Sequence, residues 1–173
     1  KYKHRDGRIF KMAETKYEKY IIKEPLYKSE RTGMQVIHVC GEDDCAGAIF
    51  QDFPADITGT YISEPFIMTS EPHAHNYDQF LFFFRGNPLN FFEFDAEIEL
   101  SLGEESEKHL IDTTSIVYIP KGLMHTPLEF KKVNKPVLFM HICFAPQYER
   151  VGGFSEEPPH RKLPKFSLEE IKS

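Results

Sequence analysis

The sequence lacks long hydrophobic runs and has few cysteines, and both absences exclude classes of protein. Its longest apolar run extends only from Phe80 to Phe84, whereas a membrane-spanning helix needs about 20 such residues. The charged N-terminal stretch has no apolar segment of the kind found in secretory signals. Three cysteines are an odd number and too few for a disulfide framework. We therefore expect a cytoplasmic protein with no membrane partner.

Basic residues are not in excess either. The formal net charge is −6, and acidic and basic residues alternate along the chain. Nucleic-acid-binding proteins normally carry a basic stripe, so nucleic acid is not expected as a partner. Cys40 and Cys45, in CGEDDC, resemble half of a zinc site. Their spacing is not C-x-x-C and no second cysteine pair follows, which disfavours that interpretation.

What the sequence does contain is a series of short apolar runs separated by Gly, Pro, Asp and Asn. Nothing of helical period and length separates these runs, which excludes alternating strands and helices. We expect a polar arm over residues 1–33, with a helix in 11–25, and a polar tail over 147–173. The domain between them, residues 34–146, holds nine expected strands: 34–40, 47–53, 60–69, 79–85, 91–102, 108–111, 115–120, 126–130 and 136–145.

The strand pattern is clearest in AEIELSL, residues 96–102. Apolar residues occupy every second position there, and Glu97, Glu99 and Ser101 occupy the positions between them. The sequence GEESE that follows favours a hairpin turn. Many short antiparallel strands in one block predict an all-β sandwich or barrel.

Two motifs carry the chemistry. EPHAHNYDQF places His73 and His75 two residues apart, so that both side chains share one face of a strand, and Gln79 follows four positions later. IPKGLMH contains Pro120 and Gly122 in a turn that presents His125. Together the two motifs would supply three imidazoles and one amide oxygen.

These motifs resemble those of the cupin superfamily, G-x5-H-x-H-x3,4-E-x6-G and G-x5-P-x-G-x2-H-x3-N. The resemblance covers about residues 34–146 and implies a jelly-roll β-barrel with N- and C-terminal extensions. It also implies one divalent transition metal, among Fe, Mn, Ni, Cu and Zn, held by His73, His75, His125 and the residue at position 79. The sequence departs from the motifs at Ile67, Thr114 and Glu129, which replace two glycines and an asparagine.

The most consequential departure is Gln79, which stands where the family has a metal-binding glutamate. Without that carboxylate the metal would keep a net charge of about +2, so it would bind less tightly and act as a stronger Lewis acid. Such a centre attracts an anionic or enolisable oxygen ligand. Alternatively, Gln79 hydrogen-bonds a histidine or water and leaves three ligands. Asp78, the nearby carboxylate, faces the opposite way on a regular strand.

Three further residues are candidates for lining a pocket: His141, His38 and Arg85, with Tyr77 and Tyr118 as weaker ones. His141 and His38 lie among alternating apolar residues, and each could serve as an acid or base or be only a packed strand residue. If Gln79 faces the metal, the phenylalanines of QFLFFFR at positions 80, 82 and 84 face outward. A homodimer partner or the N-terminal arm would cover them, as would packing within the chain.

Two functions follow as hypotheses. The first is a metal-dependent enzyme acting on a small oxygen-bearing organic molecule, by dioxygenation, isomerisation or decarboxylation. The alternative is a non-catalytic protein that uses the barrel to bind a small ligand, as a sensor, storage or assembly module. The sequence names neither the substrate nor the native metal.

Overall fold

The computed structural model describes Tyr17, Ile21 and residues 26–28, 34–40, 54–86, 89–90, 93–145 and 150–151. Within these ranges the chain forms strands and turns and no helix. The strands are β1 (Leu26–Lys28), β2 (Gln35–Cys40), β3 (Asp56–Ile62), β4 (Phe66–Thr69), β5 (Gln79–Arg85), β6 (Ala96–Leu102), β7 (Glu107–Ile111), β8 (Ser115–Ile119), β9 (His125–Val133) and β10 (Val137–Cys143). The prediction of an all-β fold is confirmed.

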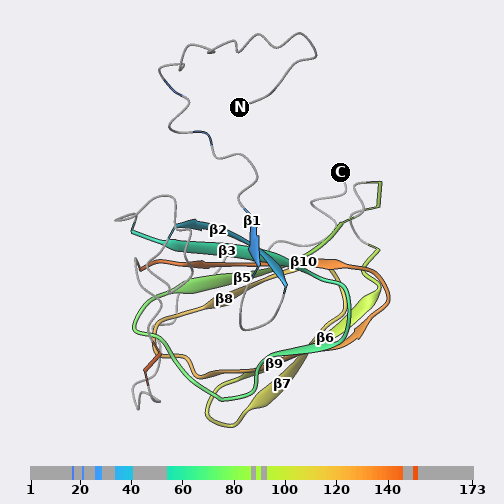
Figure 1. Ribbon diagram of the computed structural model, residues 1–173. Coiled ribbons are helices and arrows are strands. Elements are labelled where there is room, and N and C mark those ends of the chain that lie inside the picture. Colours follow the sequence, from blue (N-terminus) through green and yellow to red (C-terminus); the bar gives the residue numbers. More distant parts are fainter. Residues whose placement is uncertain are drawn as a thin grey trace, which may run out of the picture.

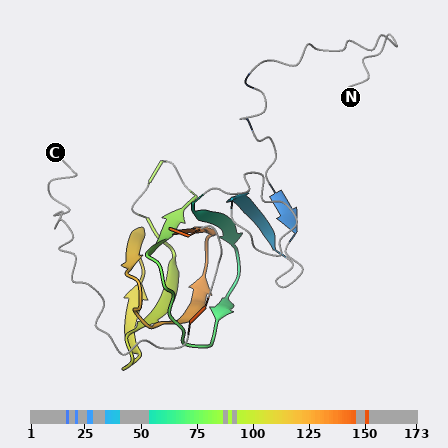
Figure 2. The same ribbon diagram turned by 90° about the vertical axis from the view of Figure 1, so that its left-hand side faces the viewer.

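Two antiparallel sheets face each other and enclose the interior (Figure 1). One has six strands in the order β1-β2-β3-β10-β5-β8, and the other has four in the order β4-β9-β6-β7. β1 and β2 extend beyond the barrel at one edge of the larger sheet (Figure 2). β1 lies within the segment expected to be an arm, and its backbone pairs with that of β2.

The expected strand over residues 60–69 is wrong, because the structure divides it between the two sheets. β3 ends at Ile62 in the larger sheet, and β4 begins at Phe66 in the smaller one. Pro65 lies between them and has no amide hydrogen with which to continue a ladder. β3 also begins earlier than expected, at Asp56.

Alternation in β5 agrees with the sequence. Leu81 and Phe83 are buried inside the barrel with Gln79, whereas Phe80 and Phe82 on the other face are partly exposed. In β6 the alternation fails at one position: Ser101 is buried, although it was assigned to the polar face with the two glutamates. The register with β9 shifts between Leu100 and Leu102, so the pairing is irregular at this position.

The core fills the interior with aliphatic and aromatic side chains from both sheets. Phe83, Phe130 and Phe139 contact one another at its centre, with ring centroids 5.3 to 6.2 Å apart. Their burial removes a large apolar area from water and fixes the spacing of the two sheets. Polar residues at the end of the barrel next to β5 and β10 are therefore held on a rigid frame.

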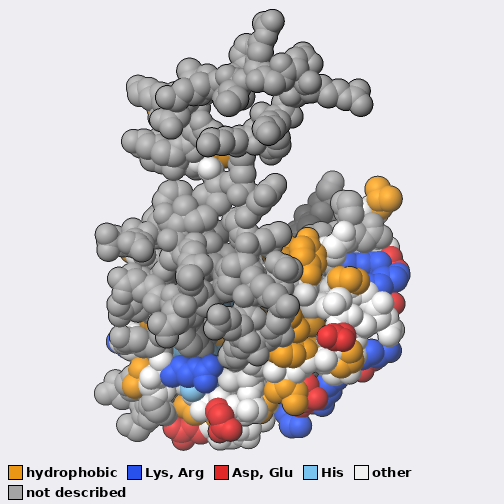
Figure 3. All heavy atoms as spheres, viewed as in Figure 1, with side chains coloured by type: hydrophobic (Ala, Val, Ile, Leu, Met, Phe, Trp, Pro, Cys, Tyr) orange, Lys and Arg blue, Asp and Glu red, His pale blue; other side chains and the backbone are white. Residues whose placement is uncertain are grey.

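Several expectations fall outside the described residues. They are the strand over 47–53, the helix in 11–25 except for Tyr17 and Ile21, and the polar tail over 147–173 except for residues 150–151. In the part of the chain that is described, no helix has the length and hydrophobicity required to cross a membrane. Figure 3 shows hydrophobic side chains in several groups among charged ones on one face of the molecule.

Candidate metal centre

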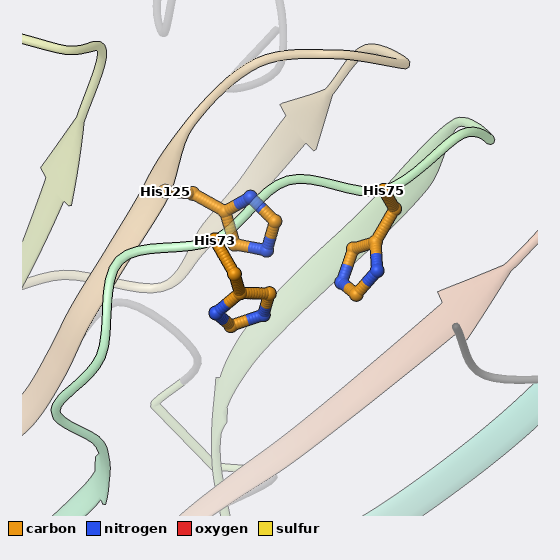
Figure 4. A group of neighbouring side chains, drawn as sticks. All are labelled: His73, His75 and His125. Atoms are coloured by element: carbon orange, nitrogen blue, oxygen red, sulfur yellow. The ribbon is translucent and has the colours of Figure 1, made fainter. Parts of the chain in front are cut away.

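Three histidines from two distant segments meet at one end of the barrel. His73 and His75 lie between β4 and β5, and His125 begins β9. Their rings face a common space (Figure 4), with centroids 4.5 to 5.0 Å apart. One ring nitrogen from each lies within 4.8 Å of the other two. The structure thus brings together the histidines of both motifs.

Backbone hydrogen bonds hold the two segments in register. The His73 amide donates to the His125 carbonyl (3.1 Å), and the His125 amide donates to the His73 carbonyl (2.9 Å). The amide of Gly122 donates to the carbonyl of His75 (2.9 Å). Gly122 has a φ of 83°, which a residue with a side chain rarely adopts, so the glycine of the second motif is required by this turn.

Two of the imidazoles are oriented by backbone carbonyls. His73 Nδ1 lies 2.9 Å from the Glu71 carbonyl, and His125 Nδ1 lies 3.0 Å from the Leu123 carbonyl. A carbonyl oxygen only accepts, so each Nδ1 carries the proton and each Nε2 keeps its lone pair. This is the arrangement in which histidine binds a metal through Nε2, with its other nitrogen fixed by an outer partner.

Thr126 adds a further support behind His73. Its hydroxyl donates to the Glu71 carbonyl (2.6 Å) and lies 3.3 Å from His73 Nδ1. The residue has a φ of 78°, which is uncommon for a β-branched side chain. The bond to Glu71 helps to hold this backbone conformation next to His125.

Burial favours the neutral form of His73 and His125. It is the largest cause of the fall in the His125 pKa to about 3; the nearby His73, His75 and Arg150 act in the same direction, and the hydrogen bond to Leu123 opposes them. The pKa of His73 is also lowered, chiefly by burial. Neutral imidazole is the form that binds a metal, so His73 and His125 are in the state that suits a transition metal near neutral pH.

Arg150 is a residue that sequence reasoning did not identify. Val151 forms an antiparallel bridge with Ala74, which lies between His73 and His75. This bridge brings the neighbouring guanidinium of Arg150 close enough to lower the pKa of His73 and His125. No motif marks Arg150, because its place depends on how the chain returns after β10.

Gln79 is buried beside the triad. Its Nε2 lies 2.9 Å from His125 Nε2, and its Oε1 accepts a hydrogen bond from Cys143 Sγ at 3.6 Å. The Gln79 amide nitrogen therefore donates to the lone pair that would bind a metal. Direct ligation through Oε1 requires the amide to present its oxygen instead, so both roles expected for Gln79 stay predictions.

The other candidate residues are dispersed. Arg85 forms an ion pair with Glu93 (2.7 Å) at the opposite end of β5 from Gln79, so the structure does not bring it to the triad. The His38 backbone pairs with Thr58 on β3, and its side chain lies outside the described atoms. Tyr77 stacks on His75, with centroids 4.8 Å apart and planes 10° apart. Asp78 Oδ1 accepts a hydrogen bond from the Lys121 amide, and Asp78 is not one of the residues that meet in the triad.

His141 belongs to a second group of metal-binding residue types, with Asp56 and Cys143. Asp56 was not singled out by the sequence, since it belongs to neither motif. The described residues therefore contain two groups that could hold a metal, the histidine triad and this mixed one.

The decisive observation for the fold is that the histidines of both sequence motifs meet in an all-β domain built of two antiparallel sheets that face each other. The chain has a cupin-type fold. No family model and no curated protein matches the sequence.

Similar solved structures include an iron(II) form of HppE, which is 14% identical, with 69% of this chain and 56% of that chain covered and a TM-score of 0.42. KdgF from Halomonas sp. is 15% identical, with 69% and 86% covered and a TM-score of 0.43. The polyketide cyclase RemF from Streptomyces resistomycificus is 12% identical, with 80% of each chain covered and a TM-score of 0.42. This chain spans about half the length of HppE (46% and 56% in two structures).

Proposed function

We propose that this cupin-type protein is a metal-dependent enzyme acting on a small, anionic, oxygen-bearing organic molecule. One observation carries the proposal: His73 and His125 are buried, neutral and oriented with Nε2 toward a common space that His75 also faces. Buried titratable groups whose pKa values are lowered and which cluster in this way are typical of a functional site.

The residues that would hold the metal are His73, His75 and His125, with Gln79 as a fourth ligand or as a hydrogen-bond partner of His125. The bound ion would polarise a carbonyl or lower the pKa of a bound water. Imidazole suits Fe, Mn, Ni, Cu and Zn to different degrees, so the donor set alone does not select one.

The preference for an anion follows from charge. Neutral ligands leave the full charge of a dication in place, and Arg150 adds a cation near the same histidines. A carboxylate or enolate oxygen is favoured over a neutral ligand in that field. Dioxygenation, isomerisation and decarboxylation all begin from such a bound oxygen group, so the class of reaction stays open among them.

The test uses metal-loaded wild type, metal-stripped wild type and the His125→Gln variant. Each is incubated in air and under nitrogen with a panel of small 2-oxo, hydroxy and enolisable acids, and products are followed by NMR. The proposal expects metal-dependent conversion of at least one compound, lost in His125→Gln. Metal-dependent binding without conversion across the panel would contradict an enzyme and favour the ligand-binding alternative.

A further inference from the structure

A second set of donor side chains lies inside the barrel, beside the histidine triad. β10 runs between β3 and β5 and places Cys143 opposite Asp56 on one side and Gln79 on the other. His141 lies two residues before Cys143, so its side chain is on the same face of the strand. The strand register alone therefore gathers a thiol, a carboxylate and an imidazole.

The distances suit a metal ion. One donor atom from each of Asp56, His141 and Cys143 lies within 4.8 Å of the other two. Asp56 Oδ2 and His141 Nε2 are 3.5 Å apart. Two ligands at about 2.1 Å from a tetrahedral zinc ion are themselves about 3.4 Å apart. His141 Nε2 also lies 2.8 Å from Thr58 Oγ1, a bond that a bound ion would replace.

The charge and the accessibility of these three side chains also suit a bound metal ion. Asp56 is 1% exposed and Cys143 is 0% exposed. A dication held by one carboxylate and one thiolate forms a group with no net charge, which is the form in which such side chains are buried most readily. The His141 side chain is 22% exposed although it faces inward, so an ion and a water ligand can approach from that side.

We propose that Asp56, His141 and Cys143 form a second metal site, distinct from the histidine triad and selective for a thiophilic dication such as Zn²⁺. Thiolate, imidazole and carboxylate are all zinc ligands, and three protein ligands leave a position for water. Gln79 spans the two groups, with its nitrogen on His125 and its oxygen on Cys143. The site does not depend on the proposed enzyme activity.

Cobalt(II) tests the proposal, because only a thiolate ligand gives a thiolate-to-cobalt charge-transfer band in the near ultraviolet. Tag-free protein is titrated with Co²⁺ near neutral pH. We expect the band in wild type and in a Cys40→Ser/Cys45→Ser double variant, whose only thiol is Cys143. We expect its loss in Cys143→Ser and at least about tenfold weaker cobalt binding in Asp56→Asn. Zn²⁺ added afterwards should abolish the band.

The His125→Gln variant separates this site from the triad. It should lose one equivalent of bound metal and keep the thiolate band, so failure of the triad and failure of the second site give different results. Absence of the band from the double variant in excess Co²⁺ would overturn the proposal, even if Cys143→Ser does not fold. A band that Asp56→Asn leaves at full strength would overturn it too, since the thiol would then bind cobalt alone.

Discussion

His73 and His125, fifty-two positions apart in the sequence, exchange both of their backbone hydrogen bonds, at 2.9 and 3.1 Å. The two residues are thus directly opposite in an antiparallel bridge, and their rings lie 4.5 Å apart. Relative placement of the two motifs is set by main-chain bonds and not by a flexible loop. A metal would therefore meet a preformed set of ligands, with little ordering cost on binding.

Gln79→Glu should tighten metal binding and weaken binding of anionic ligands. The substitution keeps length and shape but adds a negative charge beside His125 Nε2, to which the amide now donates at 2.9 Å. Direct ligation would make metal affinity at least about tenfold higher. Paired titrations with one metal and then with a small carboxylate provide the measurement. The control is Gln79→Met, which removes the amide without adding charge. If metal affinity changes by less than about threefold in Gln79→Glu, residue 79 is not a ligand.

Stability of the metal-free protein should fall as pH drops below about 6.5. Burial lowers the folded pKa of His125 to about 3, whereas the unfolded histidine titrates near 6.5. Between those values the unfolded chain binds a proton that the folded chain does not, so acid favours unfolding by up to about 1.4 kcal/mol per pH unit from this residue. Urea unfolding of chelator-treated protein across this range measures the slope.

His125→Gln should reduce that slope, because glutamine does not titrate. His109→Gln is the control, since the His109 side chain is 43% exposed on β7. Equal slopes in wild type and His125→Gln would contradict the burial effect.

Arg150→Gln should weaken binding of anionic ligands to the metal-loaded protein by about threefold to tenfold. The guanidinium is exposed, so its attraction is partly screened by water and salt. Arg150→Lys should keep most of the affinity, and higher salt should reduce the difference between the variants. Calorimetry with a small carboxylate makes the comparison. A salt-independent loss in both variants would indicate a packing role for Arg150 in place of an electrostatic one.

A homodimer is predicted to cover the outer face of β5. Phe80, Phe82 and Phe84 are partly exposed there, and Phe80 contacts Tyr118 on β8, with ring centroids 5.1 Å apart. Ile116 on β8 pairs with Phe82 and is 58% exposed. Ile116→Glu should therefore convert the dimer to a monomer in sedimentation experiments, because a buried charge in that interface is costly.

Ile67→Glu provides a matched control for this interface. Ile67 is 57% exposed but belongs to β4 in the other sheet, so its substitution should leave the dimer intact. Wild type that sediments only as a monomer at micromolar concentration would rule the interface out.

Local pattern was enough to predict most of the described strands and to single out the three histidines. Period-two alternation identified β5 and the inward side chain of Gln79, and the spacing of His73, His75 and His125 identified the histidine group. Features that depend on register between distant strands were not predictable. Asp56 was missed because its partner, Cys143, is 87 positions away and no motif joins them. Arg150 was missed for the same reason, since its position follows from the bridge between Ala74 and Val151.

Boundaries failed where one residue overrides the pattern. The run from 60 to 69 is apolar enough for one strand, yet Pro65 ends its ladder and the chain crosses to the other sheet. Ser101 is buried at a register shift between β6 and β9, and such irregularities leave no mark in the alternation of residue types.

Metal binding by the histidine triad is the central claim, and metal affinity of tag-free protein tests it most directly. Wild type and the His73→Gln, His75→Gln and His125→Gln variants are stripped, reloaded with Fe²⁺, Mn²⁺, Ni²⁺, Cu²⁺ or Zn²⁺ near neutral pH, and assayed by elemental analysis and titration. Each variant should bind at least one of these metals about 100-fold more weakly than wild type, while circular dichroism shows the fold retained. The claim is contradicted if wild type stays without metal under these conditions. It is also contradicted if the variants bind every equivalent of metal as tightly as wild type does.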